Sequence, residues 1–266
     1  LEGSTDLFSI NLSVIASERI ETIKFIYNGT EYGGAYTEYD TNKYYAEYNK
    51  LIPIITLNET DLEFYWEITL ESDFKYNSTI YNQTINKLFL DDCSTYTNQI
   101  FEFTIHDESS KEQLDGTAEN TTLEVNMEFS YLDDSSIIST FSKMYTKINP
   151  ALICIKDDSI NSTLRMDATI QYSSSGRFEE FYNIQNFEFN ESTESQDIYL
   201  YDLNSSLGQE FKITYRGIDY IPVADVIIRV QRNYIEDGLF RTVEIPFSGS
   251  NGYTIAHLIP NDPQPI

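Results

Sequence analysis

The sequence predicts an all-β protein made of two to three tandem immunoglobulin-like β-sandwich domains. Three observations predict this class: apolar and polar residues alternate along many short segments, turn-forming clusters separate those segments, and no segment has the apolar spacing of a long helix. The alternation is clearest in 8–14, 62–70 and 164–170. It is typical of antiparallel strands that have one buried and one solvated face.

Three domains are expected in order: an immunoglobulin-like β-sandwich over 1–90, a β-sandwich with one disulfide over 91–205, and an incomplete β-sandwich over 206–266. The first contains the only tryptophan, Trp66, in an aromatic strand that suits the core of such a sandwich. In the same part, Asn28-Gly29 follows an apolar segment and predicts a two-residue type I′ hairpin turn.

Nine of the 20 asparagines head N-x-Ser/Thr sequons, where about four would do so by chance, since Ser and Thr make up 49 of the 266 residues. The excess favours a chain shaped for N-glycosylation, and therefore an extracellular location on a cell or virion surface. An Asn- and Thr-rich β-protein with accidental sequons is the alternative. The nine are Asn11, Asn28, Asn58, Asn77, Asn82, Asn120, Asn161, Asn190 and Asn204.

The net charge and the apolar segments further restrict the class of protein. The formal net charge of −26 argues against binding nucleic acid through its phosphates. No apolar run reaches the ~18–20 residues of a membrane span, and a secreted chain would place Leu1 just after a removed signal peptide.

Cys93 and Cys154, the only cysteines, favour one disulfide, which would stabilise the chain by ~4 kcal/mol in the chain-entropy model. Two unrelated buried thiols are the alternative.

Four segments of the last part occur in a characteristic order: FKITY at 211–215, IPVADVIIRV at 221–230, TVEIP at 242–246 and SNGYT at 250–254. They resemble the carboxypeptidase-regulatory-like (transthyretin-like) β-sandwich modules of secreted and surface proteins, which carry a "pv-x-x-v-x-v" strand and an "s/d-x-G-x-t" turn. The resemblance implies a spacer or adhesive role and carries over no catalytic residue. The wider layout is similar to that of multidomain surface or virion proteins of archaea and viruses.

In those modules at least one further strand follows the segment that corresponds to 253–259, whereas this sequence reaches only Ile266. An open sheet edge is therefore expected, and an open edge is a template for pairing with another chain. Two interpretations are open. Either the polypeptide continues beyond Ile266, or a strand from another subunit completes the module, with 7–15 as an obvious donor.

No enzyme activity, metal ligand set or cofactor is expected from the motifs. The two histidines, His106 and His257, lie outside any nucleophile-elbow or H-E-x-x-H context. Ca²⁺ is the one cofactor considered, because three Asp-Asp steps near strand ends offer hard oxygen ligands. Solvated turn residues are the alternative for these steps, which are Asp91-Asp92, Asp133-Asp134 and Asp157-Asp158.

The sequence thus favours a secreted, N-glycosylated structural protein of a cell-surface or virion filament, assembled by β-strand addition or head-to-tail contacts. Four of the seven arginines fall in 206–266 against an acidic remainder, which favours contacts between copies. The alternative is a monomeric glycan- or protein-binding adhesin module that uses tyrosine-rich segments such as 36–45. A glycoside hydrolase with two catalytic carboxylates is a third hypothesis.

Overall fold

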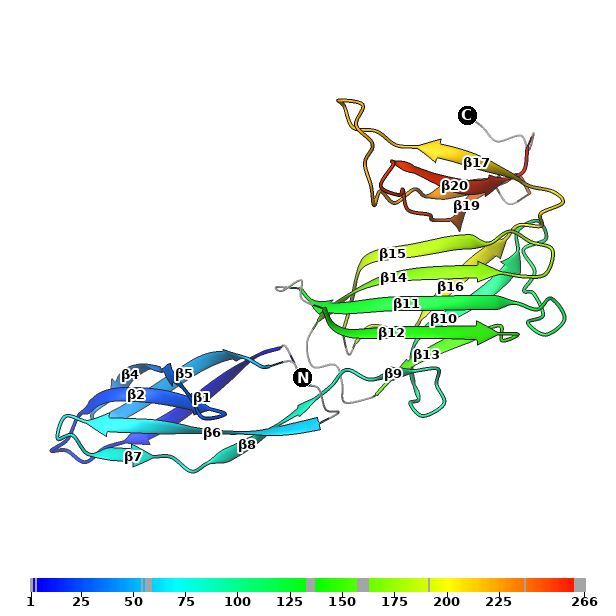
Figure 1. The fold of residues 1–266 in the computed structure, drawn as a ribbon. Coiled ribbons are helices and arrows are strands. Elements are labelled where there is room, and N and C mark those ends of the chain that lie inside the picture. Colours follow the sequence, from blue (N-terminus) through cyan, green and yellow to red (C-terminus); the bar gives the residue numbers. More distant parts are fainter. Residues whose placement is uncertain are drawn as a thin grey trace. The chain divides into compact units, whose positions relative to one another are not determined.

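The computed structural model describes residues 2, 4–53, 55, 59–132, 137–156, 163–190, 192–236 and 238–260, and these form strands and no helix (Figure 1). The all-β class is therefore confirmed. Within this part of the chain, no helix is long and apolar enough to cross a membrane. The chain forms two compact units, Leu1–Leu88 and Phe89–Ile266. The expected boundary near residue 90 lies beside this division, whereas 206–266 belongs to the second unit and is not a separate third one.

The first unit has two antiparallel sheets, with strand orders β1-β5-β4 and β3-β2-β6, and both β7 and β8 pair with β6. The predicted hairpin turn joins β2 to β3, and Asn28 and Gly29 have φ angles of 47° and 72°. Two positive φ angles are what a type I′ turn requires. The strands are β1 (Thr5–Ser13), β2 (Ile20–Tyr27), β3 (Thr30–Gly33), β4 (Ala35–Asp40), β5 (Lys43–Leu51), β6 (Glu59–Leu70), β7 (Lys75–Asn77) and β8 (Tyr81–Asn86).

An aromatic core joins the two sheets of the first unit. The ring of Phe8 on β1 lies 4.8 Å from that of Phe25 on β2, and Phe25 lies 5.0 Å from Trp66 on β6. Phe25 and Trp66 are 0% and 2% exposed. The segment 7–15, expected as a donor strand, supplies most of β1, which pairs along its whole length with β5. The segment 7–15 is therefore already hydrogen-bonded within a sheet of its own chain.

The second unit has two four-stranded sheets, ordered β16-β10-β13-β9 and β12-β11-β14-β15. β10 and β16 pair in parallel, a departure from the antiparallel pairing expected throughout. Five strands intervene between them, which gives the long connection that a parallel pair needs. The strands are β9 (Leu90–Asp91), β10 (Asn98–Asp107), β11 (Thr122–Tyr131), β12 (Ile137–Thr146), β13 (Ala151–Ile155), β14 (Leu164–Ser173), β15 (Glu180–Phe189) and β16 (Gln196–Asp202).

Four more strands form two-stranded sheets in the C-terminal part of this unit. β17 (Gln209–Thr214) pairs with β20 (Tyr253–Leu258), and β18 (Val230–Tyr234) pairs with β19 (Leu239–Glu244). Val230, Val243 and Ala256 pack with Tyr201 of β16 in one small core. The amide of Ile245 also donates a hydrogen bond to Phe181 O on β15 at 2.7 Å. These shared contacts are the reason that 206–260 does not form a unit by itself.

The strand expected over 221–230 is absent from the structure, where only Val230 of that segment lies in a strand. Pro222 lacks a backbone N–H, which disfavours a regular ladder there. The expected turn near 250–254 is present and leads into β20. Gly252 has φ 72°, and a Cβ at this position would lie 2.6 Å from Tyr215 O, so the turn requires glycine.

Candidate functional site

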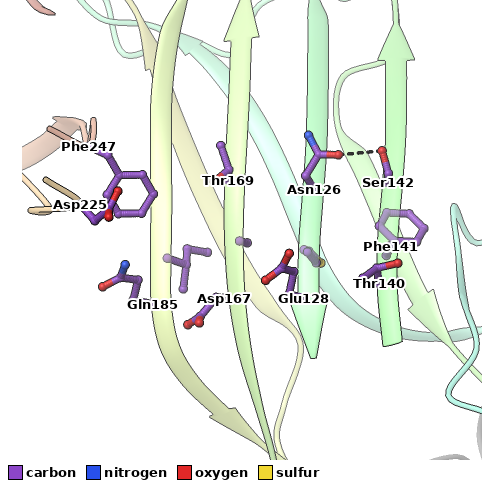
Figure 2. A pocket seen from close by; sticks show the side chains of 13 residues that line it. Asn126, Glu128, Thr140, Phe141, Ser142, Asp167, Thr169, Gln185, Asp225 and Phe247 are labelled. Carbon is purple, nitrogen blue, oxygen red and sulfur yellow. Dashed lines mark hydrogen bonds between the residues drawn. The ribbon is translucent and has the colours of Figure 1, made fainter. Parts of the chain in front are cut away.

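The face of the β12-β11-β14-β15 sheet carries a hollow of about 440 Å³ (Figure 2). All four strands line it, together with Asp225 and Phe247 of the C-terminal segment. The hydroxyl of Ser142 donates a hydrogen bond of 2.7 Å to Asn126 Oδ1 between neighbouring strands. Hydroxyl, amide and carboxylate groups beside aromatic rings can hydrogen-bond and stack with a polar ligand.

Two carboxylates lie on facing positions of this hollow. Glu128 of β11 and Asp167 of β14 are cross-strand partners, and both are exposed. Like charges directly opposite each other destabilise a strand pair, by an amount on the order of 0.2–1 kcal/mol. Asp167 Oδ1 accepts a hydrogen bond of 2.6 Å from Asn186 N. The two carboxylates therefore give the hollow a negative electrostatic potential, and their mutual repulsion lowers the stability of the sheet.

The first unit has a second cavity, an apolar groove of about 450 Å³. Ile15 and Phe74 line the groove and are 71% and 64% exposed, so the groove presents apolar surface to solvent. Among the described residues that line the groove, Glu18 is the only charged one. The apolar groove is lined by Leu12, Ser13, Val14, Ile15, Glu18, Ile68, Leu70, Phe74 and Tyr76.

A loop of the second unit, here called the apolar tip, carries Ile218, Tyr220 and Ile221, which are 102%, 78% and 60% exposed. Its backbone is closed by hydrogen bonds from Gly217 N to Ile221 O at 2.9 Å and from Tyr220 N to Gly217 O at 3.0 Å. Tyr220 has φ 63°, an uncommon conformation for a bulky residue. The loop thus presents apolar side chains to solvent on a hydrogen-bonded backbone.

The sequon asparagines lie at or near the surface of the described residues. In Asn190 and Asn204, which are half-buried, Oδ1 accepts a hydrogen bond from the hydroxyl of the sequon serine, at 2.6 and 2.7 Å. Asn58 and Asn161 lie outside the described residues. The exposed ones are Asn11, Asn28, Asn77, Asn82 and Asn120.

Cys93 and Cys154 form a disulfide with their Cα atoms 4.8 Å apart. Next to it, Asp91 accepts backbone hydrogen bonds from Cys93 N and Thr95 N at 2.9 and 2.6 Å. Asp92 pairs with Lys143 at 2.8 Å, and the hydrogen bond from Lys143 lowers the pKa of Asp92 to about 2. Both carboxylates therefore have partners within the protein. The steps at 133–134 and 157–158 lie outside the described residues.

The tyrosines of 36–45 do not form one platform. Tyr44 is 5% exposed and belongs to the core of the first unit. Tyr36 and Tyr39 are exposed on β4, and Tyr39 lies at a register irregularity between Glu38 and Asp40.

The two histidines have different surroundings. Nδ1 of His106 lies 3.0 Å from Lys111 O. His257 is 7% exposed and lies with Glu180 and Glu244, which are both 0% exposed. Burial, followed by the charge of Glu244, raises the pKa of Glu180 well above its ordinary value. Sequence reasoning missed this group because its members come from three strands; a histidine within an otherwise apolar strand was the only signal.

No model of a known protein family matches the chain, and no curated protein matches it. Among solved structures, the chain is similar to BcpA, the major pilin subunit of Bacillus cereus, at 8% identity and a TM-score of 0.25 over 76% of this chain and 60% of that one. It is also similar to the major pilin SpaD of Corynebacterium diphtheriae, at 7% identity and a TM-score of 0.27 over 77% and 62%. The Bacillus anthracis TIE protein matches at 13% identity and a TM-score of 0.27 over 96% and 44%.

The chain thus spans about 60% of the length of these pilins and less than half of the TIE protein. At TM-scores of 0.25 and 0.27, these similarities support no argument about function.

Proposed function

We propose that this chain is a secreted, N-glycosylated structural protein of a surface fibre, and that its copies join head to tail. One observation carries the proposal: the same chain presents an exposed apolar tip on one unit and an open apolar groove on the other. In the proposed contact, the tip of one copy enters the groove of the next. Copies joined in this way form an open fibre unless their rotation closes a ring.

The energetics favour such a contact. Full burial of an Ile side chain contributes on the order of 1.5–3 kcal/mol, so burial of Ile218 and Ile221, together with the ring of Tyr220, offsets part of the ~4–15 kcal/mol that association costs. Arg216 beside the tip and Glu18 in the groove have opposite charges, which favours this orientation. Arg232, in contrast, pairs with Glu108 within the chain, so the four C-terminal arginines do not all serve a partner.

The distribution of sequons agrees with the proposed contact. The last sequon is at Asn204, so glycans would leave 207–266 bare. Ten large apolar side chains between Leu207 and Ile255 are exposed. Within the described residues, neither β17 nor β20 pairs with a third strand, which leaves backbone groups for a neighbouring copy as well.

The test uses two charge substitutions at exposed positions, Ile218→Asp in the tip and Ile15→Asp at the groove. The controls are Ile235→Asp and Ile80→Asp, which are 67% and 56% exposed and outside both surfaces. Sedimentation velocity of the glycosylated chain over a range of concentrations should show large assemblies for the wild type and both controls. Each test variant alone should remain monomeric.

An equimolar mixture of Ile218→Asp and Ile15→Asp gives the sharpest readout. One variant retains only the groove and the other only the tip, so the mixture should form dimers and nothing longer. A wild type that stays monomeric at every concentration contradicts the proposal, as does assembly that both test variants leave unchanged.

The second candidate function, an adhesin module, is favoured by the hollow of Figure 2. A monomeric chain that binds an oligosaccharide saturably, with binding lost in Gln185→Ala and kept in Gln83→Ala, would support it. Gln185 lines the hollow, whereas Gln83 lies in the first unit.

A further inference from the structure

Three buried side chains from three strands converge in the second unit. Glu180 begins β15, Glu244 ends β19 and His257 lies within β20. One donor atom from each lies within 4.8 Å of the other two. His257 Nδ1 is 3.3 Å from Glu244 Oε1 and 4.0 Å from Glu180 Oε1.

The surrounding hydrogen bonds orient these donors. Glu180 Oε2 accepts a bond of 3.1 Å from Leu203 N, and Glu244 Oε2 accepts one of 3.0 Å from His257 N. The ring of Phe178 stacks on His257 with centroids 4.3 Å apart. One oxygen of each carboxylate thus accepts a backbone hydrogen bond. Among the described residues, both Oε1 atoms and His257 Nδ1 have no hydrogen-bond partner.

Buried polar atoms without partners are rare in folded proteins, because each one loses its hydrogen bonds to water and gains none in return. Two carboxylates at close range add mutual repulsion, which a cation between them would remove. Donors that share a metal ion at ~2.0–2.2 Å lie roughly 3.3 Å apart at a tetrahedral angle and at most about 4.3 Å apart. The two distances from His257 Nδ1 fall in this range, and the donor oxygens of the two glutamates lie within 4.8 Å of each other.

We infer that Glu180, Glu244 and His257 form a binding site for a divalent transition-metal ion of the zinc class. Imidazole and carboxylate together suit Zn²⁺, whereas Ca²⁺ takes oxygen ligands alone. Three protein donors leave one position of a tetrahedral ion for water. Because the donors come from β15, β19 and β20, the ion ties the C-terminal strands to the preceding sandwich.

The first experiment counts zinc on the full chain. The protein is stripped with a chelator, equilibrated with ZnCl₂, freed of excess metal and measured by mass spectrometry of the element. We expect one zinc per chain for the wild type and for His106→Gln, which changes the only other histidine. His257→Gln should lose the zinc, and Glu180→Gln and Glu244→Gln should each weaken binding at least tenfold. Glu108→Gln, at another buried carboxylate, is the matched control and should keep it.

X-ray absorption of zinc-loaded His106→Gln tests the site without altering any of the three ligands. One imidazole with oxygen neighbours is expected, and that imidazole can then only be His257. A zinc shell without imidazole overturns the inference, as does equal zinc content in wild type and His257→Gln. Failure of the wild type to retain zinc also overturns the inference. Protonation of the carboxylates, and not a metal ion, would then neutralise the charge of the buried group.

Discussion

Arg232 Nη1 lies 3.0 Å from Glu108 Oε1, and this ion pair joins β18 to the residue that follows β10. The hydroxyl of Tyr234 donates a second bond, of 2.7 Å, to Glu108 O. Glu108 is 3% exposed, and burial raises its pKa to about 7 although Arg232 opposes the shift. The C-terminal strands are therefore attached to the preceding sandwich through a carboxyl group that titrates near neutral pH.

The first prediction follows from this pKa. Because the folded-state pKa of Glu108 is about 7 and its ordinary value is 4.5, the group's contribution to stability is complete below about pH 4.5. It is lost as the pH rises through about 7, by up to about 3 kcal/mol. Hydrogen exchange of peptides from β10 and β18 should therefore speed up between pH 5 and 8, after correction for the intrinsic exchange rate.

Glu108→Gln removes the titrating group and should flatten this part of the pH dependence. Glu112→Gln, at an exposed position four residues further on, is the control and should retain it. Equal slopes in the wild type and both variants would contradict the assignment to Glu108.

The second prediction concerns the disulfide, which spans 61 residues. In the chain-entropy model, a loop of this length stabilises the folded state by about 4 kcal/mol. Reduction, or Cys93→Ser with Cys154→Ser, should therefore lower the free energy of unfolding of the second unit. Urea unfolding followed by far-ultraviolet circular dichroism measures this change.

Trp66 gives an internal control, because the only tryptophan is buried in the core of the first unit. Its fluorescence transition should stay in place when the disulfide is reduced. A shift of this transition as large as that of the second unit would show that the two units do not unfold independently.

The third prediction tests the turn between β2 and β3. Gly29 has φ 72°, and a Cβ built there meets nothing within 4 Å, so Gly29→Ala introduces backbone strain and no clash. We expect a loss of about 1 kcal/mol, seen as an earlier Trp66 transition in urea. Gly33→Ala is the matched control, since its surroundings are equally open and its φ is not positive. This change should be neutral or slightly stabilising.

The fourth prediction tests the aromatic core. Phe25→Ala removes a side chain that is 0% exposed and packs between Phe8 and Trp66. A loss of about 3–5 kcal/mol is expected, together with a red-shifted Trp66 emission. Phe74→Ala, at a position that is 64% exposed, should change the unfolding free energy by less than about 1 kcal/mol.

Local physics made several features predictable from the residues alone. Alternation with period two determined the β class, and it placed Phe8 inside and Asn11 outside β1. The Asn28-Gly29 turn could be predicted because few residues tolerate two positive φ angles in succession. The Cys93–Cys154 pairing followed from there being only two cysteines.

Only the tertiary structure decided how distant segments meet. The parallel pairing of β10 with β16, the merging of 206–260 with the preceding sandwich, and the meeting of Glu180, Glu244 and His257 all join residues far apart in sequence. Periodicity describes which face of one strand is buried, and it contains no information about which strand lies next to it. The sequence by itself therefore determined most of the strands and their buried faces, although not the irregular segment 221–229, whereas long-range packing decided the units and the candidate sites.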